Sequence, residues 1–267
     1  MDETLTALVT GASAGIGKAF ADVFGKYGFN LILTARREAR LAQVATELSA
    51  RHRVQAHVIP ADLADPAAPE QLVNEIKARG LRVDALVNNA GFGIPGKYIA
   101  TKWQDQRDFI QVLVTAPCEL AYRLAPAMAE RKRGYIINVA SLAGMLPGSA
   151  GATLYGASKS FMVQFSRSLN IELEKDSVHV TAVCPGFTYS EFHDVTGSRE
   201  RVSKMPEFMW MTAEAVAEEG YQAVMRNKAV HINGRVNKGL ALLAKYLPDQ
   251  LGLTIMKARS RERLKAD

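Results

Sequence analysis

The chain has 267 residues, a formal net charge of +6, 48% hydrophobic residues and 22% charged residues. This balance excludes a disordered or collagen-like chain, and the length suits one α/β domain with a large core. The two cysteines predict a reduced interior rather than a disulfide, and the five scattered histidines have no metal-ligand spacing, so we expect no metal site. The acidic start and the lack of a long uncharged apolar run predict a cytoplasmic protein without a signal peptide or a membrane span.

Short apolar runs alternate with helical patterns along the chain. Seven runs have the length and composition of buried strands, and they cover residues 5–10, 30–34, 54–59, 84–88, 134–138, 179–183 and 229–232. Apolar residues at helical spacing predict helices at about 17–28, 37–51, 65–79, 103–130 and 155–175. This alternation predicts a single doubly wound Rossmann-type α/β domain, with a mostly parallel seven-stranded sheet and helices on both faces. Ligands of such sheets lie beyond the carboxyl ends of the strands.

The turn after the first predicted strand is rich in glycine. Gly11 suits a tight turn, Gly15 lets a pyrophosphate approach the backbone, and Gly17 lets the next helix pack closely on the sheet. The free N–H groups at the start of that helix would then face an anion. Three glycines also occur in plain tight turns, and it is the position after the first strand that favours a dinucleotide.

The end of the second predicted strand bears on the choice of dinucleotide. An acidic residue there binds the ribose hydroxyls of NAD, whereas an arginine accommodates the 2′-phosphate of NADP. The strand is followed by Arg36 and Arg37, with no acid before Glu38. Because a guanidinium matches a phosphate with two hydrogen bonds, we expect NADP(H) rather than NAD(H), with Arg36 as the main ligand and Ser13 as a helper. The alternative is that both arginines form a solvated start to the next helix.

Tyr155 and Lys159 lie four residues apart at the start of a predicted helix, so their side chains share one face. The reference pKa of tyrosine is about 10, and a nearby cation favours the tyrosine anion. The pair could therefore act as a general acid or base near neutral pH. Spacing alone more often marks a packing pair on a surface, but Ser141 follows the fifth predicted strand, where its hydroxyl can meet Tyr155 and hold a substrate oxygen.

Together these residues resemble the classical short-chain dehydrogenase/reductase family, from residue 4 to about residue 232. The matching motifs are Thr10-Gly11-x-x-x-Gly15-Ile16-Gly17, Asp62, Asn88-Asn89-Ala90-Gly91, Ser141, Tyr155-x-x-x-Lys159 and Pro185-Gly186. The resemblance implies NAD(P)-dependent hydride transfer between a carbonyl and an alcohol on a small-molecule substrate. It implies that Tyr155 donates the proton and that Ser141 positions the substrate carbonyl. Lys159 would hold the nicotinamide ribose and lower the pKa of Tyr155.

The same resemblance implies a cofactor site along the carboxyl edge of the sheet. Asn88 would support the central strand, Asp62 the adenine ring, and the turn from Pro185 through Ser190 the carboxamide side of the nicotinamide. The residues expected at the cofactor are Gly11, Ser13, Gly15, Ile16, Gly17, Arg36, Arg37, Asp62, Leu63, Asn88, Ala90, Gly91, Tyr155, Lys159, Pro185, Gly186, Thr188 and Ser190. We also expect a homo-oligomer, either a dimer or a tetramer.

One position departs from the family pattern. The family places an asparagine in the long helix before the serine strand, where it supports a water-linked proton relay from the lysine. Leu113 occupies that position here and cannot form the hydrogen bond, while Gln111 lies about 200° round the helix and faces elsewhere. The proton could take another route, turnover could be slow, or the protein could be an NADP(H)-binding sensor or scaffold with weak or no catalysis. An epimerase or dehydratase is less favoured, because the glycine pattern resembles the classical branch rather than the extended one.

The resemblance also implies a lid over the substrate at about residues 187–211. Aromatic residues and methionines in this segment and in neighbouring loops predict a pocket for an apolar or bulky carbonyl compound, although several of them could simply be core. The candidate pocket residues are Phe187, Tyr189, Phe192, Met205, Phe208, Met209, Trp210, Phe92, Ile94, Met145 and Leu146.

The positive charge is concentrated at the C-terminus. Residues 235–267 hold eight Lys or Arg and three acidic residues, a balance of +5, and leucines at helical spacing precede and follow Pro248. We therefore expect a dinucleotide-binding and catalytic domain at 1–234 and a basic, partly amphipathic helical extension at 235–267. The extension could contact an anionic membrane surface peripherally, cover the substrate mouth or pack on a neighbouring subunit. No motif supports a nucleic-acid partner.

Overall fold

The computed structural model describes residues 4–151, 153–189 and 205–264, and it confirms the predicted fold class. Seven parallel strands form the main sheet in the order β3-β2-β1-β4-β5-β6-β9. These strands are β1 (Thr6–Thr10), β2 (Asn30–Thr34), β3 (Ala56–Val58), β4 (Ala85–Asn88), β5 (Gly134–Val139), β6 (Val178–Cys184) and β9 (Val230–Ile232). A second, two-stranded parallel sheet pairs β7 (Phe187–Tyr189) with β8 (Trp210–Thr212).

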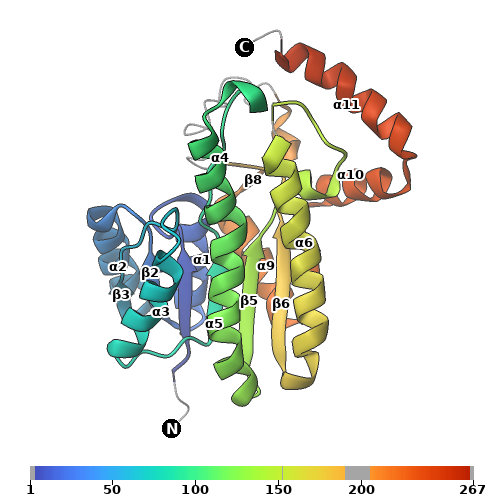
Figure 1. The fold of residues 1–267 in the computed structure, drawn as a ribbon. Helices are drawn as coiled ribbons and strands as arrows, with labels where there is room; N and C mark the ends of the chain where they lie inside the picture. The colour runs from blue at the N-terminus through green and yellow to red at the C-terminus, as the bar shows by residue number, and fades with distance from the viewer. Residues whose placement is uncertain (1–3, 152, 190–204, 265–267) are drawn as a thin grey trace.

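Helices cover both faces of the main sheet (Figure 1). One face carries α1 (Gly15–Lys26), α2 (Glu38–His52) and α9 (Ala213–Met225). The other carries α3 (Ala68–Ala78), α4 (Trp103–Ile110), α5 (Ala116–Glu130) and α6 (Thr153–Leu173). Within β1, Ala7 and Val9 pack into the core of the first face and Leu8 into that of the second. Burial on both sides explains why the central strands are unbroken apolar runs.

Two elements differ from the sequence-based expectation. The helix predicted at 103–130 is interrupted by a π-helical turn, Gln111–Thr115, which ends two residues before Pro117, a residue that has no N–H for the helical ladder. Helix α9 was not predicted, although Thr212 caps it by accepting a hydrogen bond from the Ala215 N–H at 3.1 Å. Its buried positions also recur at helical spacing, so the sequence held both signals.

Two further helices follow β9, namely α10 (Arg235–Tyr246) and α11 (Asp249–Leu264), with Pro248 between them. We call this pair the C-terminal arm. Figure 1 shows it beside the end of the molecule where the strands have their carboxyl ends. None of the helices in the described part of the chain has the length and apolar character needed to cross a membrane.

Candidate functional site

Strand order reverses between β1 and β4, and hydrogen bonds join the ends of these two strands. The Thr10 hydroxyl donates to the Val87 carbonyl at 3.2 Å and accepts from the N–H groups of Asn89 and Ala90 at 2.9 and 3.0 Å. The Asn89 side chain donates to the carbonyls of Thr10 and Gly11 at 2.9 and 3.3 Å. The glycine turn is therefore held against the loop after β4, at the place where α/β sheets bind ligands.

The glycine turn leaves room for a ligand to approach the backbone. Gly11 and Gly15 have φ angles of +66° and +55°, which favour glycine. A Cβ on Gly17 would lie 2.2 Å from the Gly11 carbonyl oxygen, so only glycine lets α1 start this close to the turn. Within the described residues no side chain caps α1, whose N-cap is Ala14, so its first N–H groups can face an anion. This turn fits the pyrophosphate of a dinucleotide.

Two arginines reach the glycine turn from the start of α2. Arg37 Nη2 donates to Ser13 Oγ at 3.1 Å, and Arg40 Nε donates to the Ser13 carbonyl at 3.1 Å. Arg36, the arginine we favoured from the sequence, is exposed, and no hydrogen bond joins it to the turn within the described residues. Arg40 was missed, although its spacing of three from Arg37 puts both on one side of the helix.

Ser141, Tyr155 and Lys159 come together at the carboxyl end of β5. Ser141 precedes the short helix η3 (Leu142–Met145), and its side chain is hydrogen-bonded to that of Tyr155 on α6. One helical turn later, Lys159 Nζ lies 5.8 Å from the centroid of the Tyr155 ring. Lys159 Nζ also donates to the Val139 carbonyl at 2.8 Å. The three residues predicted to be catalytic are therefore neighbours.

Burial shifts the pKa values of both titratable residues. Burial raises the pKa of the Tyr155 phenol above its usual range, and the Ser141 hydrogen bond opposes this shift. Burial lowers the pKa of Lys159 to about 8, because its side chain is only 7% exposed. Tyr155 is therefore a neutral phenol at neutral pH, while Lys159 carries most of its charge there and loses it near pH 8.

Close backbone contacts hold the loops of the site together. A Cβ on Gly144 would lie 2.6 Å from the Lys159 carbonyl carbon, so η3 lies directly on α6. The N–H of Leu142 donates to the Pro185 carbonyl at 2.8 Å, which ties η3 to the turn after β6. A Cβ on Gly186 in that turn would lie 2.5 Å from the side chain of Asn237, so α10 also packs on the site.

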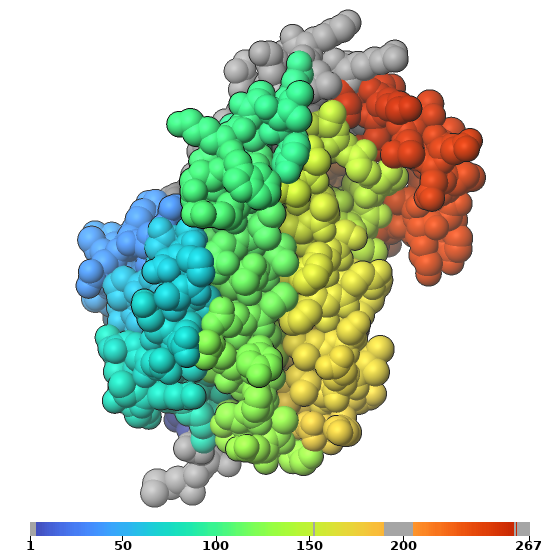
Figure 2. All heavy atoms as spheres, in the orientation of Figure 1, coloured from blue at the N-terminus to red at the C-terminus, as the bar shows by residue number. Residues whose placement is uncertain are grey.

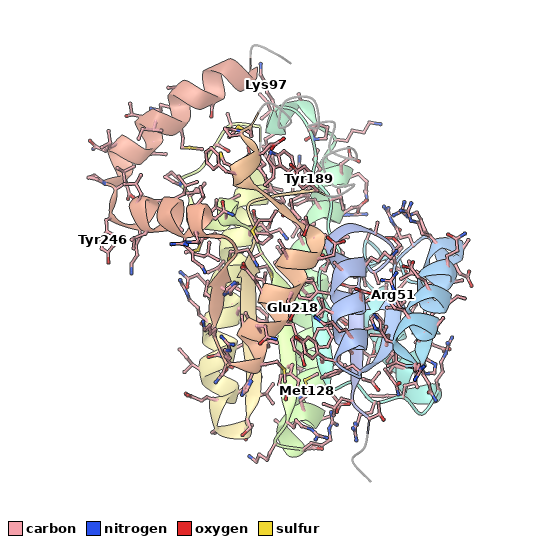
Figure 3. All side chains as sticks on the ribbon, turned by 180° about the vertical axis from the view of Figure 1, so that it is seen from behind. Arg51, Lys97, Met128, Tyr189, Glu218 and Tyr246 are labelled. Carbon is pink, nitrogen blue, oxygen red and sulfur yellow. The ribbon has the colours of Figure 1, made fainter. Side chains whose placement is uncertain are left out.

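A pocket opens beside Tyr155. Its lining consists of Ile94, Gly96, Tyr98, Gln106, Phe109, Gly151, Thr153, Leu154 and Tyr155. Among the pocket residues that we predicted from the sequence, Ile94 is part of this lining. Figure 3 labels Tyr189, which is half exposed and stacks on Trp210 with the ring centroids 4.7 Å apart. Ser190 and Phe192 lie outside the described residues.

Comparison with known proteins agrees with this arrangement. The family model described as short chain dehydrogenase matches residues 5–201. The chain belongs to the short-chain dehydrogenase family.

Three relatives illustrate the range of the family. A very-long-chain 3-oxoacyl-CoA reductase of Coprinopsis cinerea is 37% identical over 196 residues, which are 72% of this chain and 57% of that reductase. Sulfoacetaldehyde reductase 2 of Chromohalobacter salexigens is 37% identical over 187 residues, 69% of this chain and 73% of that enzyme. Among solved structures, a short-chain dehydrogenase from Sphingobium yanoikuyae in complex with NADPH is 30% identical in sequence and has a TM-score of 0.79. The match covers 91% of this chain and 96% of the Sphingobium chain. The chain thus matches little more than half the length of the fungal relative.

Four further predicted cofactor residues of this short-chain dehydrogenase lie in strands or in the loops that follow them. Asp62 Oδ1 accepts from the Ala64 N–H at 3.1 Å, and Leu63 is buried. Asn88 is buried, and its side-chain amide donates to Asn138 Oδ1 at 2.9 Å. Thr188, in β7, is 4% exposed. Sequence reasoning assigned no role to Asn138.

Leu113 is buried in the π-helical turn of this short-chain dehydrogenase. It is 2% exposed and belongs to an apolar cluster that includes Phe109 and packs against Tyr155. The Gln111 side chain does not replace the missing asparagine, since its buried Nε2 has no hydrogen-bond partner among the described residues. The position expected to hold a relay group is therefore apolar.

Proposed function

We propose that this protein is an NADPH-dependent reductase that interconverts an apolar or bulky carbonyl compound and the corresponding alcohol. The observation that carries the proposal is the hydrogen-bonded pair of Ser141 and Tyr155 beside the buried Lys159. Tyr155 also lines the pocket, so its phenol can meet a substrate. The proposal is further supported by the NADPH complex of the related Sphingobium enzyme.

The chemistry of the three side chains follows from their protonation. When bound, the reduced dinucleotide supplies a hydride to the carbonyl carbon. Tyr155 gives its proton to the carbonyl oxygen, and burial favours the presence of that proton beforehand. Ser141 donates a hydrogen bond to the same oxygen. The Lys159 cation stabilises the phenolate that remains, because an opposite charge nearby favours the ionised form.

NADPH is the favoured dinucleotide because of the groups around Ser13. The guanidinium groups of Arg37 and Arg40 both approach this residue, and each is a planar donor suited to phosphate. No acidic residue stands between the end of β2 and Arg37 to bind ribose hydroxyls instead. We therefore expect a 2′-phosphate to be held by Ser13, Arg37 and Arg40.

The apolar substrate class is supported by the pocket rather than by the relatives. Ile94, Phe109 and Leu154 provide an apolar wall, and Gln106 and Thr153 provide a few polar groups. The names of the two related reductases give a very-long-chain 3-oxoacyl-CoA in one case and sulfoacetaldehyde in the other. Because these two substrates differ so much, we base the class on the lining.

The test compares two tyrosines of the same pocket. Wild type should oxidise NADPH with a panel of long-chain and aromatic ketones and aldehydes. Tyr155→Phe should lose about 10²–10⁴-fold in turnover, the usual contribution of a general acid, and should bind NADPH as before by calorimetry. Tyr98→Phe also removes a phenol from the pocket and should stay within a few-fold of wild type. Full activity in Tyr155→Phe would refute the mechanism.

The buried Leu113 favours a second candidate, an NADP(H)-binding sensor or scaffold. An apolar side chain packs near Tyr155 where the family places a hydrogen-bonding one, so the supply of protons to the site is weakened. The same experiment separates the two functions. Tight NADPH binding without turnover on every carbonyl of the panel would support the sensor, whereas turnover would exclude it.

A further inference from the structure

Exposed large apolar side chains gather on the C-terminal arm. Among the described residues sixteen such side chains are exposed, and seven of them belong to the arm. They are Val236, Leu242, Leu243, Tyr246, Leu251, Leu253 and Ile255, which we call the arm surface. Figure 2 shows the arm standing out from the body of the protein, and these residues are 39–72% exposed in the described part of the chain.

Helix α10 is apolar on the side that faces away from the protein. Asn237 and Ala241 are its buried residues and define the inner side. At about 100° per residue, the exposed residues Leu242, Leu243 and Tyr246 fall on the outer side, within a stripe roughly 100° wide. Figure 3 labels Tyr246, which lies on the outside of the arm. A stripe of this width is what a helix uses to bury one face.

The charges beside this stripe are positive. Lys238 and Lys245 are exposed on α10, as are Arg235 at its start and Lys257 on α11, and none of them forms an ion pair within the described residues. Asp249 is the acidic residue of the arm whose side chain the structure describes. Lys245 Nζ lies 5.4 Å from the centroid of the Tyr246 ring, so a cation stands directly beside the apolar stripe. Large apolar groups beside cations on one helix are the pattern of segments that lie on an anionic bilayer.

Charge also argues against a second copy of the chain as the main occupant. A two-fold contact would place the same patch of each copy face to face, and so would bring the lysines of both arms together. A bilayer with anionic headgroups offers the opposite charge and an apolar layer at once. We propose that the C-terminal arm docks on an anionic lipid surface through the arm surface and its flanking lysines.

The arm is attached to the loop that forms the pocket mouth. The Ala150 N–H donates to Ser260 Oγ on α11 at 3.1 Å. Gly252, also on α11, is buried against Pro147 of the same loop, since a Cβ on this glycine would lie 2.9 Å from the proline side chain. The next residue of that loop, Gly151, lines the pocket. Docking would hold the pocket close to the bilayer, where an apolar carbonyl compound is dissolved. Lipid binding itself does not depend on the proposed reaction, so each can fail without the other.

The first test reverses charge. The full chain is sedimented with vesicles of phosphatidylcholine alone and of phosphatidylcholine mixed with phosphatidylglycerol. We expect binding to the anionic vesicles, weakened by salt. One lysine near such a surface contributes about fivefold to partitioning, so Lys238→Glu with Lys245→Glu should lower it at least ~20-fold. The matched double variant Lys77→Glu with Lys228→Glu, on exposed residues outside the arm, should partition much more like wild type.

The second test removes apolar contact without changing charge. Leu243→Ser with Tyr246→Ser should lose binding to the anionic vesicles, whereas Tyr122→Ser with Ile171→Ser, two similarly exposed residues on α5 and α6, should keep it. Circular dichroism checks that each variant is folded. Absence of wild-type sedimentation, or equal partitioning of arm and control variants, overturns the proposal. Light scattering that shows the arm variants to be smaller assemblies with unchanged vesicle binding would assign the surface to a second copy.

Discussion

Lys159 is buried, and burial disfavours its charged form. Its pKa is about 8 in the folded chain, against 10.5 for the ordinary side chain. Below pH 8 the lysine is protonated in both the folded and the unfolded state, so the folded state bears the full penalty of burying a cation. Between pH 8 and 10.5 only the unfolded state keeps the proton, and the penalty disappears as pH rises.

Lys159→Met should therefore stabilise the protein at pH 7 while it abolishes turnover. The lowered pKa corresponds to about 3 kcal/mol, of which the lost hydrogen bond to the Val139 carbonyl offsets about 1 kcal/mol. We expect a gain of roughly 2 kcal/mol in the free energy of unfolding at pH 7, shrinking toward pH 10. Urea unfolding at both pH values measures it, with the exposed Lys77→Met as the control. A less stable Lys159→Met at pH 7 would contradict the burial argument.

Arg40, which sequence reasoning missed, should favour the binding of NADPH over NADH, because its guanidinium lies at Ser13. Charge-assisted hydrogen bonds contribute about 1.5–3 kcal/mol, so Arg40→Ala should weaken NADPH binding by about tenfold or more and leave NADH binding nearly unchanged. The exposed Arg36→Ala is the control and should change neither. Calorimetric titration with both dinucleotides gives the answer. Equal loss for the two would mean that Arg40 only supports the Ser13 turn.

At the scale of single residues, sequence position predicted which polar groups share an edge, but it predicted only some of the side-chain contacts. Ser141 and Tyr155 could be placed together because one follows a strand and the other starts the next helix. Arg36 and Arg37 follow the same strand, and the tertiary direction of α2 decides that Arg37 lies at Ser13. The pocket lining includes Gln106 from α4, whose orientation no local pattern encodes.

Among the elements, η3 and α6 are the pair on which the site depends, since one follows Ser141 and the other carries Tyr155 and Lys159. Gly144→Ala should separate them, because the new Cβ would lie 2.6 Å from the Lys159 backbone. We expect at least a ~10²-fold loss of turnover and a loss of about 1–3 kcal/mol in stability, as for overpacked cores. Gly148→Ala is the matched control, since no atom lies within 4 Å of its Cβ position. Unchanged kinetics in Gly144→Ala would show that the contact is not needed.

The helix predicted at 103–130 shows what helix prediction from sequence cannot find. Periodic apolar residues predicted one helix over 103–130, and both ends of that prediction agree with α4 and α5. The π-helical turn between them lies just before Pro117 and buries Val112 and Leu113. Local periodicity records that a residue is apolar, but it does not record a change in helical winding.

For the molecule as a whole, alternating strands and helices were enough to predict the sheet and its two covered faces. The attachment of the C-terminal arm to the pocket loop could not be predicted, because it joins residues 110 apart in the sequence, Ala150 and Ser260. Gly252→Val should push α11 away from Pro147 and disturb that loop. We expect KM for the carbonyl substrate to rise several-fold with NADPH affinity unchanged. Ala258→Val, on an exposed position of α11, should have no such effect, and equal KM values in the two variants would contradict the coupling.

The hydrogen bonds of the Thr10 hydroxyl also bear on when this part of the fold can form during synthesis. Its bonds to Asn89 and Ala90 span 79 and 80 residues of sequence, so the contact between the glycine turn and the loop after β4 does not exist on a shorter nascent chain. The glycine turn can already contact Thr34, Arg37 and Arg40, but its contacts with the loop after β4 form only once that strand has left the ribosome. On the proposed function, binding of a dinucleotide during synthesis therefore has to wait for that strand. A nascent chain stalled before Ala90 should therefore contain the glycine turn but bind the proposed dinucleotide weakly.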